Sequence, residues 1–169
     1  MIVGPTLSDI LGRMCRAMAE VGVYEGAGAK QLRAEFPRAK LYLIDPWTTY
    51  RMSRSYAIDN SPPHWLRAES ACRRRFGNDR RAVILKMTGR EAARQIPDAS
   101  LDVVRLDAGR TRKILTSHLN DWVPKIKPGG VLCGDGLAGY YRREVRQVLN
   151  ARFGTAWIQQ GRTRWAIKL

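Results

Sequence analysis

The sequence has few cysteines, and their spacing fits neither a disulfide framework nor a structural zinc site. Cys15, Cys72 and Cys133 are odd in number and far apart in the 169-residue chain, and no two of them form a CxxC pair. Cysteines that bind zinc or staple small secreted domains come in paired, short spacings. We therefore expect three reduced thiols that pack as small apolar side chains.

Long hydrophobic runs are also lacking. No apolar stretch approaches the roughly 18 residues that a membrane-spanning helix needs. The first residues reach Gly4 and Pro5 too soon to form the apolar core of a secretory signal. These absences predict a protein without membrane attachment, located in the cytoplasm.

Acidic residues are scarce beside basic ones. The chain has 30 Lys and Arg residues against 15 Asp and Glu residues, which gives a formal net charge of +15 at pH 7. Residues 51–169 hold 24 of the basic residues and ten of the acidic ones. Such an excess favours anionic partners, among them RNA or another nucleic acid, phosphorylated substrates and acidic proteins. The alternative is a solvated, arginine-rich surface, because most of the basic residues are dispersed along the chain.

Histidine, the usual general base, occurs only twice. His118 falls on the apolar face of an expected helix, which favours a core histidine. His64 follows Pro62 and Pro63 in a stretch without clear periodicity, residues 48–64, which we interpret as a long loop broken by the two prolines. Long loops in compact domains are often functional, so His64 is a candidate catalytic residue.

Strand-like and helix-like segments alternate along the chain. This order is typical of an α/β protein with a mostly parallel sheet, and we expect residues 1–169 to form a single domain. The expected strands are 18–23, 41–44, 82–87, 101–106 and 131–133, the last following a turn at 128–130. The expected helices are 7–17, 29–36, 65–76, 90–96, 114–123 and 140–153. Residues 156–159 and 165–167 predict a closing antiparallel hairpin.

A glycine-rich segment, residues 20–28, lies where the first strand becomes a helix. Gly22 and Gly26 allow the backbone to turn and to approach a ligand without a Cβ atom in the way. The helix that starts near Gly28 offers unpaired N–H groups to an anion. Asp45 ends the next strand, 17 residues after Gly28, where a carboxylate commonly accepts hydrogen bonds from ribose hydroxyls. Its alternative is an ordinary turn or helix-capping residue.

Four segments taken in order, residues 20–28, 43–47, 101–107 and 122–132, resemble the class I S-adenosylmethionine-dependent methyltransferases. The similarity is greatest to small O-methyltransferases related to the catechol methyltransferases. The resemblance implies a Rossmann-like fold with helices on both faces of the sheet and a reversed last strand. It also implies S-adenosylmethionine as cofactor and methyl transfer to the oxygen of an unidentified acceptor.

The resemblance further implies roles for individual residues. Asp107 would lie beside the cofactor's methionine end and the reacting centre, as a candidate catalytic residue. The implied cofactor-binding residues are Glu20 at the amino group, Gly22, Gly26 and Gly28 around the methionine moiety, Asp45 at the ribose, Pro46 and Trp47 beside the adenine, and Met87 with Thr88 on its other side.

The sequence departs from that family after the fourth strand. Relatives continue with Asp-Ala-Asp-His where residues 107–110 read Asp-Ala-Gly-Arg, and metal-using relatives have Asp-Asn where this chain has Asp135 and Gly136. Asp107 and Asp135 could still hold Mg²⁺ with water completing the coordination shell. Arg105 is unusual within a strand expected to be buried. Two hypotheses therefore stay open: an active methyltransferase that acts on the oxygen, or less readily the nitrogen, of an unidentified acceptor that the positive charge would favour if it is anionic, or a catalytically degenerate methyltransferase fold that serves as an RNA-associated or structural binding module.

Overall fold

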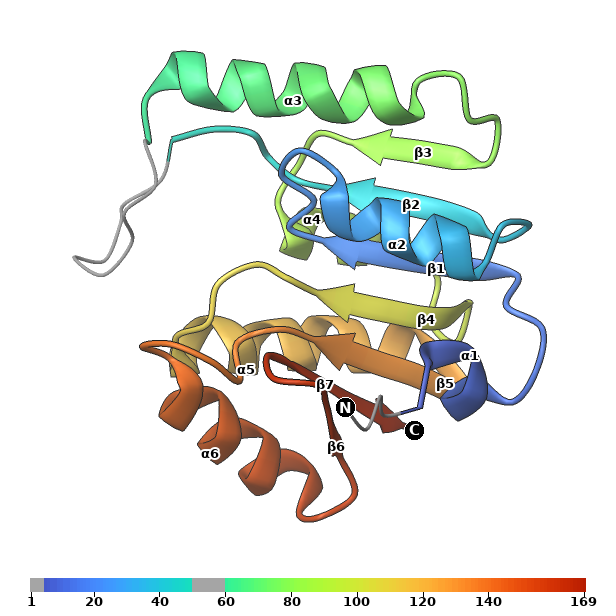
Figure 1. Cartoon of the computed structure of the whole chain (residues 1–169), viewed down its shortest axis with the longest axis vertical. Coiled ribbons are helices and arrows are strands. Elements are labelled where there is room, and N and C mark those ends of the chain that lie inside the picture. The colour runs from blue at the N-terminus through green and yellow to red at the C-terminus, as the bar shows by residue number, and fades with distance from the viewer. Residues whose placement is uncertain (1–4, 50–59) are drawn as a thin grey trace.

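A seven-stranded sheet forms the centre of the protein, in the order β3-β2-β1-β4-β5-β7-β6. The computed structural model describes residues 5–49 and 60–169. The arrowheads of β1 to β5 point toward the same edge (Figure 1) because these strands pair in parallel. The strands are β1 (Ala17–Val21), β2 (Lys40–Ile44), β3 (Ala82–Leu85), β4 (Leu101–Leu106), β5 (Ile126–Gly134), β6 (Ile158–Gln160) and β7 (Arg164–Lys168).

Helices cover both faces of this sheet. The described helices are α1 (Leu7–Leu11), α2 (Ala27–Glu35), α3 (Pro62–Phe76), α4 (Gly89–Gln95), α5 (Arg112–Trp122), the short 3₁₀ helix η1 (Val123–Lys125) and α6 (Arg142–Phe153). Apolar side chains of α1, α2 and α3 pack with one face of the sheet, and those of α4, α5 and α6 pack with the other. None of the helices in the described part of the chain is long and apolar enough to cross a membrane.

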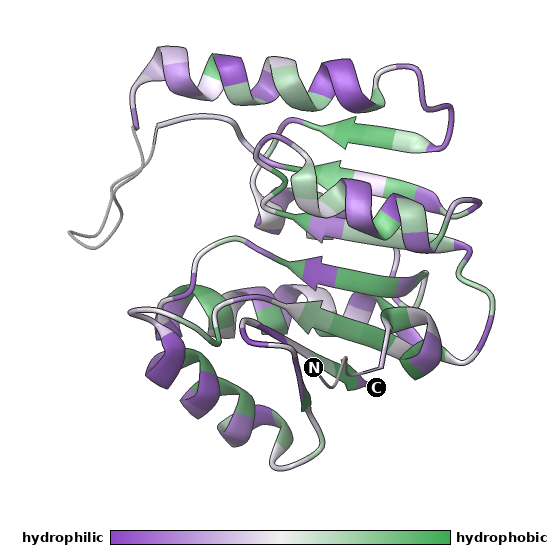
Figure 2. Ribbon diagram, viewed as in Figure 1, coloured by the Kyte–Doolittle hydropathy of each residue, from purple (hydrophilic) through white to green (hydrophobic). Residues whose placement is uncertain are grey.

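The central strands are apolar on both sides because both faces are covered. In β4, Val103 packs toward the side of α1 to α3, while Val104 packs toward the side of α4 to α6. In β1, Met18 likewise packs toward the side of α1 to α3, and Ala19 packs toward the side of α4 to α6. Hydrophobic residues accordingly concentrate in the strands, and hydrophilic residues appear along the outer helices (Figure 2). Alternation along β1 and β4 decides which face receives each polar side chain.

The C-terminal strands confirm the predicted antiparallel hairpin. β7 pairs antiparallel with β5, with Leu132 opposite Ile167, and β6 pairs antiparallel with β7. Together with the parallel strands and the two helical layers, this is the Rossmann-like class I arrangement expected from the sequence.

The expectation of one helix over residues 7–17 is wrong. α1 begins after a capping box in which Thr6 and Asp9 satisfy each other's backbone N–H groups, and it ends at Leu11. Gly12 then adopts a left-handed conformation, with φ 66°, which closes the helix. β1 already begins at Ala17, so the second half of the expected helix is connecting chain and strand.

The expectation of a loop over residues 48–64 is also wrong for its last residues. Pro62 and Pro63 begin α3 instead of breaking it, since proline needs no backbone N–H partner in the first turn of a helix. His64 therefore lies in α3, and residues 50–59 are outside the described part of the chain. The turn expected at 128–130 lies within β5.

His118 provides a test of this core. It lies in α5 with its Nδ1 atom buried and without a hydrogen-bond partner among the described residues. Burial lowers the pKa of His118 below its usual value, against the raising effect of Asp121. The unfolded chain therefore binds the proton more readily, and stability is lost as pH falls below about 6.5. We expect His118→Gln to flatten the decrease in unfolding free energy below that pH in urea titrations. An unchanged slope would contradict this assignment.

Candidate cofactor and active site

The candidate site lies where the strand order reverses, between β1 and β4. From this point β2 and β3 extend to one side and β5 to the other. Glu20 of β1 lies opposite Arg105 of β4, and the next pair is Val21 with Leu106. Ligands of open α/β sheets bind outside the carboxyl ends of the strands at such a switch point. The sheet thus brings the glycine-rich segment, the end of β2 and the end of β4 to one edge.

Close packing leaves no room for a side chain at the glycines of this segment. Gly22 has a φ of +88°, and a Cβ atom there would lie 2.6 Å from the Cβ atom of Ala108. Gly26 forms the N-cap of α2 with a φ of +84°, and a Cβ atom there would lie 2.8 Å from the ring of Phe76. A Cβ atom on Gly28 would collide with the Glu20 carboxylate. The three glycines let the turn after β1 fit between the end of β4 and α3.

Asp45 joins the end of β2 to this turn. Its Oδ2 atom accepts a hydrogen bond of 2.9 Å from the backbone N–H of Tyr24, and its Oδ1 atom accepts one of 2.8 Å from that of Trp47. The side chain is buried, and burial raises the pKa of Asp45 against the effect of these two bonds. Each carboxylate oxygen can accept a further bond. Asp45 is therefore a structural link whose carboxylate still has acceptor positions left over.

The residues expected beside the adenine have structural partners of their own. Trp47 is only 3% exposed and packs in the core on the side of α3. Its ring N–H donates a 2.8 Å hydrogen bond to the carbonyl of Tyr24. Pro46 beside it is half-buried. Thr88 caps α4, and its hydroxyl donates a 2.7 Å hydrogen bond to Glu91.

A cluster of four charged side chains occupies the switch point. Glu20 is 1% exposed, and its Oε1 atom lies 3.3 Å from Nε of Arg105. The same guanidinium reaches Asp107 at 3.5 Å, and Arg110 contacts the other Asp107 oxygen at 3.0 Å. Burial raises the pKa of Glu20 to about 8, against the lowering effect of Arg105. The sequence analysis singled out Glu20 and Asp107 as candidate site residues and Arg105 only as unusual in a buried strand.

The described residues do not form the magnesium site that Asp107 and Asp135 left open. No group of three or more His, Cys, Asp or Glu side chains lies close enough to hold a metal ion in the described ranges. Asp107 faces two guanidinium groups, which repel a cation. Asp135 accepts a 2.6 Å hydrogen bond from the N–H of Gly136 and contacts the Thr163 hydroxyl at 3.4 Å. This donor set does not fit Mg²⁺.

His64 lies beside the glycine-rich turn, although it is helical. Its Nε2 atom is 3.2 Å from the Tyr24 hydroxyl, and the two rings stack with centroids 5.5 Å apart. Sequence reasoning missed Tyr24, which has a φ of 53° within the turn. An aromatic residue next to Glu25 and Gly26 was the only signal, and it does not reveal a partner 40 residues away.

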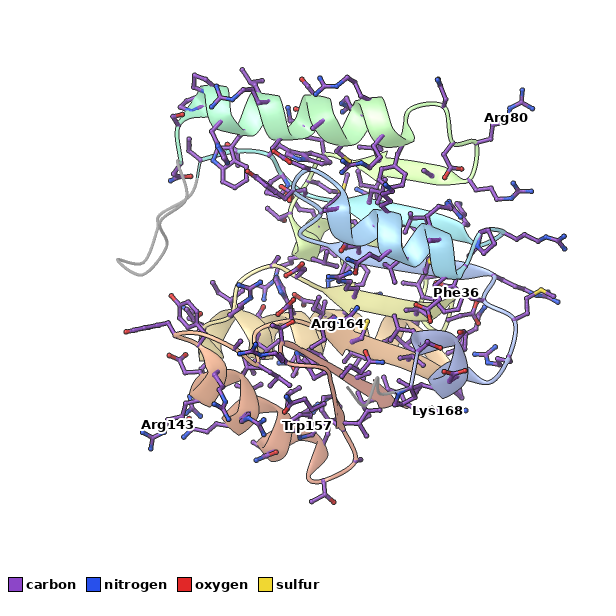
Figure 3. All side chains as sticks on the ribbon, viewed as in Figure 1. Phe36, Arg80, Arg143, Trp157, Arg164 and Lys168 are labelled. Carbon is purple, nitrogen blue, oxygen red and sulfur yellow. The ribbon has the colours of Figure 1, made fainter. Side chains whose placement is uncertain are left out.

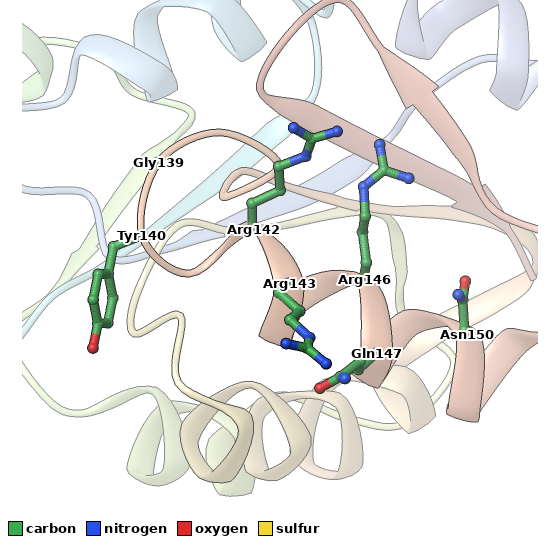
Figure 4. A pocket seen from close by; sticks show the side chains of 7 residues that line it. All are labelled: Gly139, Tyr140, Arg142, Arg143, Arg146, Gln147 and Asn150. Atoms are coloured by element: carbon green, nitrogen blue, oxygen red, sulfur yellow. The ribbon is translucent and has the colours of Figure 1, made fainter.

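Some of the surface arginines form ion pairs or hydrogen bonds with other residues of the chain. In the Arg73–Arg75 run, Arg73 pairs with Glu69 at 2.8 Å and Arg75 donates to the Glu25 carbonyl. Arg80 and Arg143 extend outward at opposite ends of the molecule (Figure 3). A depression of about 450 Å³ on α6 is lined by Gly139, Tyr140, Arg142, Arg143, Arg146, Gln147 and Asn150 (Figure 4). It lies next to the loop that follows β5.

Solved structures with the same fold include a spermidine synthase and two proteins described as candidate O-methyltransferases. A candidate O-methyltransferase from Klebsiella pneumoniae is 13% identical, with a TM-score of 0.65, over 96% of this chain and 77% of that one. A candidate caffeoyl-CoA O-methyltransferase from Staphylococcus aureus is 13% identical, with a TM-score of 0.59, over 100% of this chain and 86% of that one.

Spermidine synthase from Thermotoga maritima is 11% identical, with a TM-score of 0.64, over 96% of this chain. The chain spans only 56% of that enzyme's length. No curated protein sequence matches the chain. At these identities the structural likenesses show the fold alone.

A family model described as a methyltransferase domain matches residues 19–136, which include the glycine-rich turn, Asp45, Asp107 and Asp135. The match covers most of the sheet and the whole switch point. The expected family is thereby confirmed: the chain belongs to the methyltransferase-domain family and has the class I S-adenosylmethionine-dependent methyltransferase fold.

Proposed function

We propose that the chain binds S-adenosylmethionine at the switch point and transfers its methyl group to the oxygen of an anionic acceptor. The supporting observation is the convergence of three acids, Glu20, Asp45 and Asp107, around the glycine-rich turn. Glu20 retains one buried oxygen, Oε2, without a hydrogen-bond partner in the described chain. A buried polar atom of this kind destabilises the fold unless a ligand or a water molecule forms a hydrogen bond with it. The residues therefore fit the cofactor.

The bound cofactor would supply a methyl group already activated on a sulfonium. In our proposal the chain's own residues hold the reactants: Asp45 accepts from the ribose hydroxyls, and Glu20 accepts from the amino group. Asp107 lies at the end of β4 and is 24% exposed at its side chain, so it can orient an acceptor hydroxyl. His64 is the candidate general base. Positioning alone can supply much of the rate acceleration for such a transfer.

Two further features support parts of this proposal. The arginines that line the α6 depression suit an acceptor with phosphate or carboxylate groups.

All three cysteines are buried and free, and burial raises the pKa of Cys15 and Cys133 to about 12. Unreactive reduced thiols agree with a cytoplasmic location. The RNA-associated binding module receives no comparable support, because two arginines of the 73–75 run are bonded within the chain.

The test is cofactor binding by an Asp45→Asn variant. Asparagine keeps one oxygen for the backbone N–H groups but removes the charge and one acceptor. We expect the affinity for S-adenosylhomocysteine in calorimetry to fall by about 5- to 100-fold, which corresponds to the loss of one or two hydrogen bonds. Asp98→Asn is the matched control, since Asp98 is 70% exposed and pairs with Lys125. The proposal fails if wild type binds nothing at millimolar ligand, or if both variants bind equally.

A further inference from the structure

Arg105 lies on the same side of the sheet as Glu20 and underneath α2. The two residues are register partners in β1 and β4. A Cβ atom on Gly28, in the first turn of α2, would lie 2.9 Å from the Arg105 guanidinium carbon. The side chain is 9% exposed. A guanidinium is thus enclosed between the two central strands and the helix whose N-terminus faces the candidate site.

The contacts of this guanidinium are all long. It lies 3.3 Å from Glu20, 3.5 Å from Asp107 and 3.5 Å from the Gln31 side-chain oxygen. Charge-assisted hydrogen bonds to carboxylates are usually about 2.7–2.9 Å. Nε of Arg105 and Oε2 of Glu20 have no hydrogen-bond partner among the described residues. A guanidinium and a carboxyl group therefore retain unused hydrogen-bonding capacity side by side.

A nucleoside bound at Asp45 would lie along the line from β2 toward β4. Asp45 lies at the end of β2, on one side of β1, and Arg105 lies in β4, on the other side. With the ribose on Asp45 and the adenine on the β3 side, the nucleoside's 5′ substituent would extend over β1 toward the Glu20–Arg105 pair. For S-adenosylmethionine that substituent ends in an α-ammonium and an α-carboxylate.

The charges at the switch point match this zwitterion. Glu20 and Asp107 supply two carboxyl groups, while Arg105 and Arg110 supply two guanidinium groups. The planar guanidinium of arginine can bond both oxygens of a carboxylate. Glu20 can accept from the ammonium through the oxygen that now lacks a partner among the described residues.

We propose that Arg105 binds the α-carboxylate of the cofactor and so makes this chain select nucleosides that keep the carboxylate over their decarboxylated counterparts. This inference rests on the proposed function. The competing explanation is an ion pair that only neutralises Glu20 within the fold. The two differ in one measurable respect, because a purely structural pair does not distinguish ligands that differ only in the carboxylate.

Three nucleosides separate the contributions in calorimetry: S-adenosylhomocysteine, its decarboxylated analogue with a 3-aminopropyl chain, and 5′-methylthioadenosine, which lacks the amino acid. We expect wild type to bind S-adenosylhomocysteine at least about 10-fold more tightly than the decarboxylated analogue, the usual effect of one charge-assisted pair. Arg105→Met should reduce this ratio to near one. Its affinity for 5′-methylthioadenosine should stay within about 3-fold of wild type.

Two further variants keep the test decisive. Arg105→Lys retains the charge that offsets Glu20 but cannot form the bidentate contact, so we expect an intermediate ratio. Arg33→Met is the matched control, because Arg33 is also a partly buried α2-side arginine in an ion pair, with Asp79 at 2.8 Å. Arg33 donates to the carbonyls of Phe36, Pro37 and Ala39, and its replacement should leave the ratio unchanged.

The outcomes distinguish the two levels of inference. A wild type that binds none of the three nucleosides overturns the proposed function. A wild type that binds S-adenosylhomocysteine and the decarboxylated analogue equally overturns the role of Arg105 alone, even if no variant folds. An Arg105→Met protein that keeps the wild-type ratio, or loses affinity for all three nucleosides equally, also overturns it.

Discussion

Replacing Asp102 with alanine is expected to lower the free energy of unfolding by about 2–4 kcal/mol, because two backbone N–H groups would lose their acceptor and two half-exposed cations would lose their counter-charge. Asp102 is 0% exposed at the start of β4, at the edge of the sheet opposite the candidate site. Its carboxylate accepts from the backbone N–H groups of Arg16 and Ala17 at 2.9 and 3.0 Å. Lys127 and Arg13 each approach it to 3.0 Å. The measurement is urea denaturation at pH 7.

Asp98→Ala is the matched control. Asp98 also pairs with a lysine, at 2.6 Å, but its side chain is 70% exposed, and exposed pairs contribute little. Its loss should change the unfolding free energy by less than about 1 kcal/mol. Equal losses in the two variants would show that burial of Asp102 is not what makes it stabilising.

The Asp102 contacts also predict a dependence on pH. Burial raises the pKa of Asp102, but hydrogen bonds from Arg16 and Ala17 together with Lys127 outweigh it and hold the pKa below the usual range. A carboxyl with a depressed folded-state pKa stabilises above its unfolded value of about 3.9, and this stabilisation is lost as pH falls through the lower folded value. Acid titration of the wild type should show this loss, and Asp102→Asn should lack it.

Replacing Gly22 with alanine is expected to remove cofactor binding and to cost about 2–5 kcal/mol of stability, since two penalties add: a positive φ for a residue with a side chain, and overpacking. The φ is +88°, and the new Cβ atom would meet the Asp107 carbonyl carbon at 2.8 Å and the Ala108 Cβ atom at 2.6 Å. Because these neighbours are backbone and a short side chain at the end of β4, they can yield only if the turn and the strand separate.

Gly161→Ala isolates the contribution of the close contact. Gly161 has a φ of +60°, yet nothing lies within 4 Å of its added Cβ atom. This variant should lose about 1 kcal/mol through the backbone alone and retain its affinity for S-adenosylhomocysteine. If Gly22→Ala is no less stable than Gly161→Ala and still binds the nucleoside, the glycine-rich turn does not form the cofactor site.

Local sequence patterns determined much of this protein. The alternation of apolar strands with amphipathic helices was sufficient for the α/β class and the antiparallel hairpin, because periodicity reports which faces are buried. The glycine-rich segment was recognisable for a similar reason: a turn between a strand and a helix needs residues that tolerate positive φ, as at Gly22 and Gly26. Asp45 could be placed because the carboxyl ends of neighbouring parallel strands meet at one edge.

Only the tertiary structure decided the features that depend on distant contacts. Proline both breaks and begins helices, so the start of α3 at Pro62 depended on the core that Trp65 and Phe76 enter further along the helix. Arg105 is stable inside β4 because pairing across strands sets it beside Glu20, 85 positions earlier in the chain. The buried carboxylate of Asp102 acquires its partners in the same way, from residues brought together at the opposite edge. The composition of a strand shows that a charge is present, whereas pairing and packing decide whether a counter-charge neutralises it.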